Sequence, residues 1–257
     1  MTKKLKCQSN ILGLAMLMAA CGFWGTASNA WAARNPNPGV MPINSNPFGM
    51  SYGNWGAAWW AWGLSIDADQ NPITDPDGSF CHVGQSGPVW FLAGNFGGDA
   101  VRTCTVPKGK AIFFPILNNT YWAPEDLEFV RDFLAPYLEV DTTGWTDEEL
   151  LRFGVNWASD HATSLSVTID GVPVNDPWQY RAESDVYSIE LSDVIEDFGY
   201  PPGTRSPSVA DGYWIMLAPL KAGPHTIHIQ GSAAYVTPAD PFDDAFSVDV
   251  KYELTVE

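Results

Sequence analysis

The chain has few basic residues for its length, and this scarcity disfavours several classes of partner. Its 257 residues include 13 Lys and Arg against 30 Asp and Glu, which gives a formal net charge of −17. The phosphates of nucleic acids are neutralised by Lys and Arg, so nucleic acid is not an expected partner. An anionic membrane surface is disfavoured for the same reason. The excess of acid fits a protein that stays dissolved outside the cell, or one that binds cations.

Long apolar segments are also missing, apart from one short run near the N-terminus. Residues 11–24 form an apolar run of about fourteen residues, whereas a membrane-spanning helix needs about twenty. The run follows the basic stretch MTKKLK and precedes the A-x-A pattern at 30–32. We therefore interpret residues 1–33 as a secretory signal peptide that is cleaved after Ala32 or Ala33. The predicted location is secreted or periplasmic, and the mature chain has no predicted transmembrane segment.

Cysteine is scarce, and its distribution predicts one disulfide. Of four cysteines, Cys7 and Cys21 lie in the predicted signal peptide. A lipoprotein with Cys21 as the lipidated residue is the less favoured alternative to simple cleavage. Cys81 and Cys104 remain, and in an exported protein a lone pair is most simply a disulfide. Two free buried thiols are the alternative.

Short apolar segments bounded by turn residues predict a mainly-β fold. Some are apolar throughout, as expected of strands buried on both faces, and others alternate apolar and polar residues, as expected of strands with one wet face. Their number and the turn-rich links favour an antiparallel β-sandwich or a jelly roll. Strands are expected at 87–94, 110–118, 164–174, 186–191, 211–220, 222–231 and 246–256.

Helical patterns add two elements to this framework. The stretch NWGAAWWAWGLS at 54–65 places Trp55, Trp59 and Trp62 on one stripe of a helix, which Asn54 can cap. Burial of this stripe against a sheet is the favoured interpretation, and an aromatic platform for sugars is the alternative. A pair of amphipathic helices forms a predicted helical insertion at about 124–162, and Thr146 and Glu149 form a capping-box pattern at the start of the second helix.

The domain organisation follows from these elements. Residues 34–50 are rich in Pro and Asn and are expected to form an extended N-terminal arm. Residues 51–257 are long enough to form a single β-sandwich domain that contains the helical insertion.

One acidic stretch raises the question of a metal site. The acidic loop, defined here as residues 65–81, offers oxygen ligands at alternate positions, as calcium-binding loops do. Pro72 stands where such a loop needs Gly, and Gly78 stands where it needs Glu. The favoured interpretation is therefore a pair of turns, with an irregular calcium site as the alternative. The candidate ligands are Asp67, Asp69, Asn71, Asp75 and Asp77.

Other residues are weaker candidates for chemistry. Asp211, just before an apolar strand, is the best single candidate for a catalytic carboxylate, with a turn role as the favoured alternative. Ligand-stacking aromatic residues near loops are Trp122, Trp145 and Trp178, for which burial in the core is the alternative. A second acidic cluster comprises Asp240, Asp243 and Asp244. The four histidines, His82, His161, His225 and His228, have no metal-binding spacing.

Three phrases of the sequence resemble a known group of proteins. GPVWFLAG, CTVPKGKAIFFPILN and DGYWIMLAPLKAGPHTI are similar to phrases in a family of exported bacterial proteins of unassigned function. The resemblance runs from about Trp55 to the C-terminus. It implies an exported single domain and transfers no catalytic residues.

Two functions are consistent with the sequence. The first is an exported, acidic, disulfide-bonded binding or surface protein, calcium-stabilised if the acidic loop binds the ion, whose ligand is a glycan or another small molecule. It is favoured because no catalytic constellation is recognisable. The alternative is a secreted hydrolase that cleaves a polysaccharide with acidic residues as general acid and base.

Overall fold

Two five-stranded sheets form the framework of the protein. The structure is a computed structural model, and it describes residue 37, residues 39–235 and residues 244–257. Sheet A contains β1 (Val89–Phe91), β3 (Ala111–Trp122), β6 (Arg181–Glu183), β7 (Tyr187–Leu191) and β8 (Gly203–Leu217). Sheet B contains β2 (Gly98–Val106), β4 (Ala162–Ile169), β5 (Val172–Pro173), β9 (Gly223–Tyr235) and β10 (Asp244–Val256). The predicted mainly-β, sandwich-like class is confirmed.

Each sheet is mixed, where the sequence favoured purely antiparallel pairing. In sheet A the order is β1-β3-β8-β6, with β7 also on β8, and β1 runs parallel to β3. In sheet B the order is β2-β10-β9-β4-β5, and β2 runs parallel to β10. The remaining pairs are antiparallel. A short, continuously apolar strand fits either direction of pairing, so the pattern of β1 could not distinguish them.

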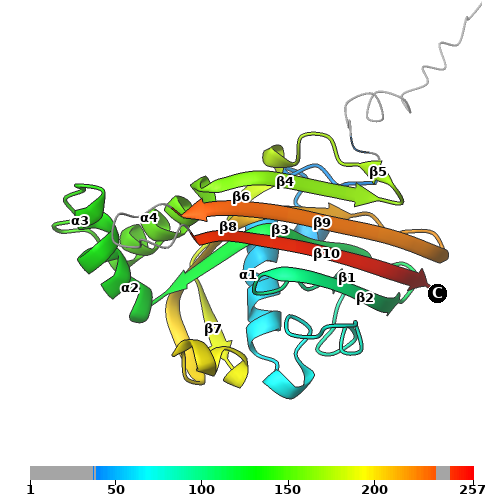
Figure 1. Ribbon diagram of the computed structural model, residues 1–257, viewed down its shortest axis with the longest axis horizontal. Helices are drawn as coiled ribbons and strands as arrows, with labels where there is room; N and C mark the ends of the chain where they lie inside the picture. The colour runs from blue at the N-terminus through cyan, green and yellow to red at the C-terminus, as the bar shows by residue number, and fades with distance from the viewer. Residues whose placement is uncertain (1–36, 38, 236–243) are drawn as a thin grey trace, which may run out of the picture. The chain divides into compact units, whose positions relative to one another are not determined.

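Sheet A lies between a helix and sheet B. Helix α1 (Tyr52–Leu64) packs against β8, β6, β7 and β3, while β4 and β9 of sheet B approach β3 from the other face (Figure 1). The middle strands are consequently buried on both faces, from Ala111 to Leu117 in β3 and from Val209 to Leu217 in β8. Such burial requires the continuous apolar runs that the sequence shows there.

The tryptophan stripe of α1 faces this core. Trp55, Trp59 and Trp62 are all buried, as predicted. Gly56 allows close packing, since a Cβ there would lie 2.7 Å from the Trp214 ring of β8. The helix begins one residue after Ser51, whose side chain accepts a hydrogen bond from the backbone N–H of Asn54. Asn54 itself is therefore not the cap.

The predicted helical insertion is present between β3 and β4. It comprises α2 (Glu125–Phe129), a π-helical turn (Val130–Leu134), α3 (Ala135–Tyr137) and α4 (Asp147–Asp160). The capping box of α4 forms as expected, because the Thr146 and Glu149 side chains each accept from the other's backbone N–H. The insertion packs around a small second apolar cluster that also includes Val209 of β8, and α4 contacts β3 and β8.

Short 3-10 turns complete the described elements. They span Pro47–Gly49, Ala68–Gln70, Pro177–Tyr180 and Asp193–Phe198. The described part of the N-terminal arm is tied to the domain, since Val40 is buried and Met41 donates its backbone N–H to Met216 O at 2.8 Å. Among the residues that the structure describes, no helix is both long enough and apolar enough to cross a membrane. The predicted signal peptide lies outside them.

Candidate functional site

The acidic loop uses its buried polar side chains to hold its own turns. Asp75 is 2% exposed, and its two carboxylate oxygens accept the backbone N–H groups of Asp77, Gly78 and Phe80 at 3.1, 3.1 and 2.7 Å. Asn71 is fully buried and donates to the carbonyls of Gly63 and Ile66 at the end of α1. Both residues therefore satisfy backbone groups that the turns and the helix end leave open.

The other predicted metal ligands do not converge with them. Asp67 and Asp69 are exposed, and Asp77 accepts the hydroxyl and backbone N–H of Ser79, which together lower the pKa of its carboxyl. In the described ranges no three His, Cys, Asp or Glu residues gather into a group that could hold a metal ion. The geometry favours the turn interpretation over a calcium site.

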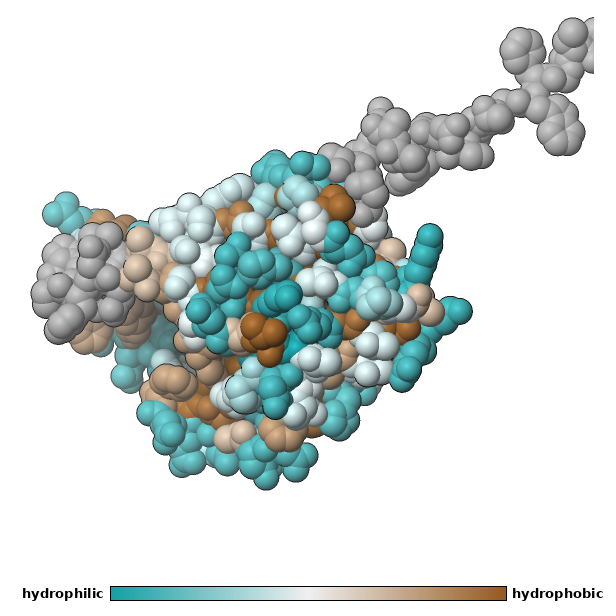
Figure 2. All heavy atoms as spheres, turned by 45° about the vertical axis from the view of Figure 1, so that its right-hand side comes forward, coloured by the Kyte–Doolittle hydropathy of each residue, from teal (hydrophilic) through white to brown (hydrophobic). Residues whose placement is uncertain are grey.

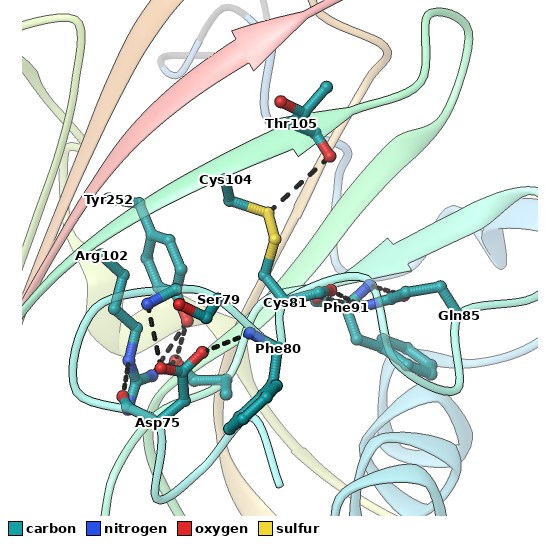
Figure 3. Close-up of a disulfide and its surroundings, with 12 residues drawn as sticks. Asp75, Ser79, Phe80, Cys81, Gln85, Phe91, Arg102, Cys104, Thr105 and Tyr252 are labelled. Carbon is teal, nitrogen blue, oxygen red and sulfur yellow. Dashed lines mark hydrogen bonds between the residues drawn. A yellow bond between two sulfur atoms is a disulfide. The ribbon is translucent and has the colours of Figure 1, made fainter. Parts of the chain in front are cut away.

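The acidic loop is fastened to sheet B by a disulfide. Cys81 and Cys104 are bonded, as predicted, so the end of the loop is joined to β2 (Figure 3). Gly78 lies against the same strand, since a Cβ there would be 2.2 Å from Thr103 O and its φ is +94°. This close approach explains why Gly occupies the position at which a calcium loop needs Glu.

A buried arginine fastens the loop further. Arg102 is 2% exposed and donates to the backbone carbonyls of Ile73 (2.9 Å) and Asp75 (2.7 Å), as well as to those of Ala93 and Gly94 and to the Tyr252 hydroxyl (Figure 3). A buried guanidinium is tolerated only when its donors are satisfied in this way. The loop, the segment after β1 and β10 are thus joined at one point.

Asp211 has the surroundings of a structural residue. It is 1% exposed, and its Oδ2 accepts from Arg181 Nε at 2.9 Å and from Nη2 at 2.7 Å. Its Oδ1 accepts the Gly212 N–H at 2.9 Å. Arg181 also contacts Asp160 of α4, so this pair links the helical insertion to sheet A. Asp211 lines neither of the two cavities described below.

The predicted stacking residues and histidines lie in separate places. Trp145 packs edge-on against Phe153 in the helical insertion, and Trp178 is 41% exposed beside Tyr213. The histidines of β9 have different partners, with His225 bonded to Asp170 and His228 bonded to Asp249. His161 bonds to the Trp157 carbonyl, and His82 is exposed. Asp240 and Asp243 lie outside the described residues, as does the side chain of Asp244.

Trp122 differs from the other aromatic candidates because it lines a cavity between the sheets. We call this space, of about 370 Å³, the inter-sheet cavity. Strand β1 pairs with β3 only as far as Phe113, and none of the described strands covers that edge of β3 beyond it. Figure 1 shows β3 continuing past β1 towards the helical insertion. The cavity lies along this uncovered stretch of β3.

The wall of the inter-sheet cavity is mostly apolar. Sheet B contributes Ile229, Val248 and Val250, and α1 contributes Trp60 and Leu64. The complete lining is Trp59, Trp60, Leu64, Ile73, Gly94, Asn95, Phe96, Pro115, Ile116, Leu117, Asn118, Asn119, Thr120, Trp122, Ile195, Phe198, Tyr200, Ile229, Phe246, Val248 and Val250. Apolar and aromatic walls with a few polar groups are typical of small-molecule sites.

Three donors in this wall have no acceptor. They are Trp60 Nε1, Asn118 Nδ2 and Trp122 Nε1, each buried and without a hydrogen-bond partner. By contrast, the Nε1 groups of Trp55, Trp59 and Trp62 each donate to a backbone carbonyl at 2.9 Å. A buried donor left unpaired costs about 1–3 kcal/mol. Trp90 Nε1, which lines neither pocket, is the fourth such donor among the described residues, so the gathering of the other three at one cavity favours a ligand-binding role.

A smaller acidic pocket adjoins the inter-sheet cavity. It shares Thr120, Trp122 and Tyr200 with the cavity and adds Tyr121, Glu125, Asp126 and Phe129. Asp126 Oδ2 accepts the backbone N–H of Trp122 at 2.8 Å. Burial is the main cause that raises the pKa of Asp126 to about 7, and the charge of Glu125 adds to the effect.

Exposed aromatic residues lie at the cavity. Phe96 and Phe198, which both line it, are 38% and 63% exposed, and their rings meet edge-on at 5.5 Å. Figure 2 shows that hydrophobic side chains reach the surface in separate patches among hydrophilic ones. Single exposed hydrophobic residues are common, but a pair that also lines a cavity is consistent with an entrance.

Sequence reasoning had identified Trp122 and missed the other two unpaired donors. Trp60 lies beside the tryptophan stripe of α1, and Asn118 ends the apolar run of β3. The polar amide of Asn118 at the end of an apolar strand was the one signal in the sequence that could have indicated the site. Asp126 was one acid among three at the start of a helix, so nothing in the sequence distinguished it.

Comparisons with protein-family models, curated proteins and solved structures find no match to this chain. The function must therefore be inferred from the geometry of the site.

Proposed function

We propose that this is an exported, non-enzymatic binding protein that holds a small, largely apolar molecule in the inter-sheet cavity. The observation that carries the proposal is the apolar cavity of about 370 Å³ with three unpaired donors in its wall. Cavities of about 300–1,000 Å³ are the usual size for small-molecule ligands. Burial of the ligand's apolar surface would supply the affinity, and the donors would orient it.

Export is supported by the disulfide. Disulfides persist in oxidising compartments and are rare in the cytosol. The Cys81–Cys104 bond therefore agrees with the secretory signal that the sequence predicts at residues 1–33, and with the predicted secreted or periplasmic location.

The proposal is tested by titration with Nile red, an uncharged fluorescent dye with a carbonyl oxygen. The wild-type protein is expected to bind it with a blue-shifted, enhanced emission and a dissociation constant of about 1–10 μM. Val248→Trp fills the inter-sheet cavity from β10 and is expected to weaken binding at least about tenfold.

Val101→Trp is the matched control for this substitution. Val101 is 60% exposed on β2 and does not line the cavity, so the same change should leave Nile red binding as it is. Thermal unfolding of both variants checks that they fold. Absence of binding by the wild-type protein, or an equal loss in both variants, would refute the proposal.

A secreted hydrolase is the second candidate function, and one observation favours it. Asp126 has a pKa of about 7 and lies in the acidic pocket beside Glu125. A carboxylic acid that stays protonated near neutral pH can serve as the general acid in glycoside hydrolysis. A panel of polysaccharides would release reducing ends with the wild-type protein and not with Asp126→Asn. If no polysaccharide is cleaved, this second candidate is rejected and the binding proposal is unaffected.

A further inference from the structure

Building on the proposed function, we infer that the inter-sheet cavity selects an uncharged ligand whose oxygen atoms accept hydrogen bonds, such as an ester, and discriminates against the corresponding carboxylate. Three features of the described residues lead to this ligand class. They are the kind of polar group left open in the wall, the groups already occupied, and the charges around the cavity.

The open polar groups are donors. The indole N–H groups of Trp60 and Trp122 can only donate, and Asn118 Nδ2 is a donor as well. A pure hydrocarbon would leave all three unpaired after binding, at the cost that buried unpaired donors carry. A ligand with a carbonyl or ether oxygen would satisfy them and recover that cost.

Several other polar side chains in the wall are already occupied. Thr120 Oγ1 shares a hydrogen bond with the Tyr187 hydroxyl at 2.6 Å, and Asn95 Nδ2 donates to Gly98 O at 3.0 Å. Asn119 Nδ2 is directed at Ser159 Oγ, 3.5 Å away. Recognition of the ligand's polar end therefore falls to the buried donors of Trp60, Asn118 and Trp122, and the Tyr200 hydroxyl in the same wall is a further group that can donate.

No cation is available in the wall to receive an anion. Among the described residues, the lining of the cavity contains no Lys, Arg or His. The adjoining acidic pocket contributes Glu125 and Asp126, and the nearby Arg205 is engaged with Glu125 Oε1 at 2.8 Å and with the Pro201 carbonyl. A buried carboxylate without a counter-ion costs several kcal/mol, and the net charge of the chain adds repulsion.

A matched pair of probes tests this selection. Methyl dodecanoate and dodecanoate share one apolar chain and differ in charge, and dodecanoate is fully ionised at about pH 8. Each is used to displace Nile red from the wild-type protein. The ester is expected to displace the dye at a concentration at least about tenfold lower than the carboxylate.

Variants of the donors test the hydrogen bonds. Trp122→Phe, Trp60→Phe and Asn118→Leu each remove one donor and keep an apolar side chain, so each should weaken ester binding by roughly threefold to tenfold. Trp55→Phe is the control, because Trp55 Nε1 donates to the Pro47 carbonyl and Trp55 does not line the cavity. Three separate donor variants keep the test usable if one of them fails to fold.

The outcomes separate this inference from the proposed function. Dodecanoate binding as tightly as the ester would overturn the inference and leave the binding function standing. Unchanged ester affinity in all folded donor variants would overturn it as well. Failure of Nile red to bind the wild-type protein would overturn the proposed function itself, whereas a dye that binds and is displaced by neither probe would overturn the inference alone.

Discussion

The buried carboxyl of Asp126 should make the stability of the protein depend on pH, and Asp126→Asn should remove that dependence. Asp126 lies in the first turn of α2, where its Oδ2 accepts the Trp122 N–H. The charged and titratable groups around it are Glu125, Tyr200 and, beyond Glu125, Arg205. Asn can accept the same hydrogen bond but carries no charge at any pH, so it isolates the effect of ionisation.

The magnitude follows from the two pKa values. Burial raises the pKa of Asp126 from 3.8 to about 7 in the folded protein. Between these values the folded state holds a proton that the unfolded state has lost, so the free energy of unfolding falls as pH rises. Each pH unit lowers the free energy of unfolding by about 1.4 kcal/mol, so the total loss between pH 4 and pH 7 is about 4 kcal/mol. Above the folded pKa this contribution is constant.

Urea unfolding of the wild type and of Asp126→Asn, measured at intervals from about pH 4 to pH 8, gives the difference in unfolding free energy. The variant should gain about 4 kcal/mol relative to the wild type across that range. Asp132→Asn, an exposed acid of the same helical insertion, controls for the loss of one negative charge. A difference that stays constant with pH would refute the reasoning.

Three further outcomes are expected from the way the structure is held together. Replacing Cys81 and Cys104 by Ser should lower the free energy of unfolding in urea by about 3 kcal/mol, because a loop of 23 residues is no longer closed; an unchanged midpoint would contradict this. Gly78→Ala should lower the free energy of unfolding by about 3 kcal/mol, because its Cβ would meet a backbone oxygen of β2. Gly87 also has a positive φ but open space around it, so Gly87→Ala should lower the same free energy by only about 1 kcal/mol. Asp211→Ala should lower the free energy of unfolding by about 2 kcal/mol, because Arg181 Nε and the Gly212 N–H lose an acceptor although Arg181 keeps Asp160, and Nile red binding should persist; loss of binding by the folded variant would assign Asp211 to the site instead.

Local patterns in the sequence predicted much of the fold. The tryptophan stripe of α1, the capping box of α4 and the disulfide depend on residues close together in sequence or on the chemistry of a single pair, and all three are present as expected. The parallel pairing of β1 with β3 and of β2 with β10 was not expected. Strand direction depends on which distant segments meet, and alternation of residue type does not encode it.

The candidate site was harder to predict, for a related reason. The inter-sheet cavity exists because β1 ends at Phe91 while β3 continues to Trp122, which leaves an edge of β3 uncovered. Its unpaired buried donors come from α1 and β3, and each looks ordinary in its own segment. The acidic loop attracted attention because its acids are adjacent in sequence, yet Asn71 and Asp75 hold turns. Proximity in sequence thus indicated a structural feature, whereas the cavity arises from tertiary contacts.

A neutral ligand in the inter-sheet cavity should accept hydrogen bonds from the indole groups of Trp60 and Trp122. The most direct measurement is the nuclear magnetic resonance signal of each indole N–H during titration with methyl dodecanoate, assigned with the Trp→Phe variants. The signals of Trp60 and Trp122 are predicted to move downfield and saturate together, while that of Trp55, already bonded to the Pro47 carbonyl, stays in place. Ligand binding that leaves the Trp60 and Trp122 signals unmoved would contradict hydrogen bonding by these two indole groups.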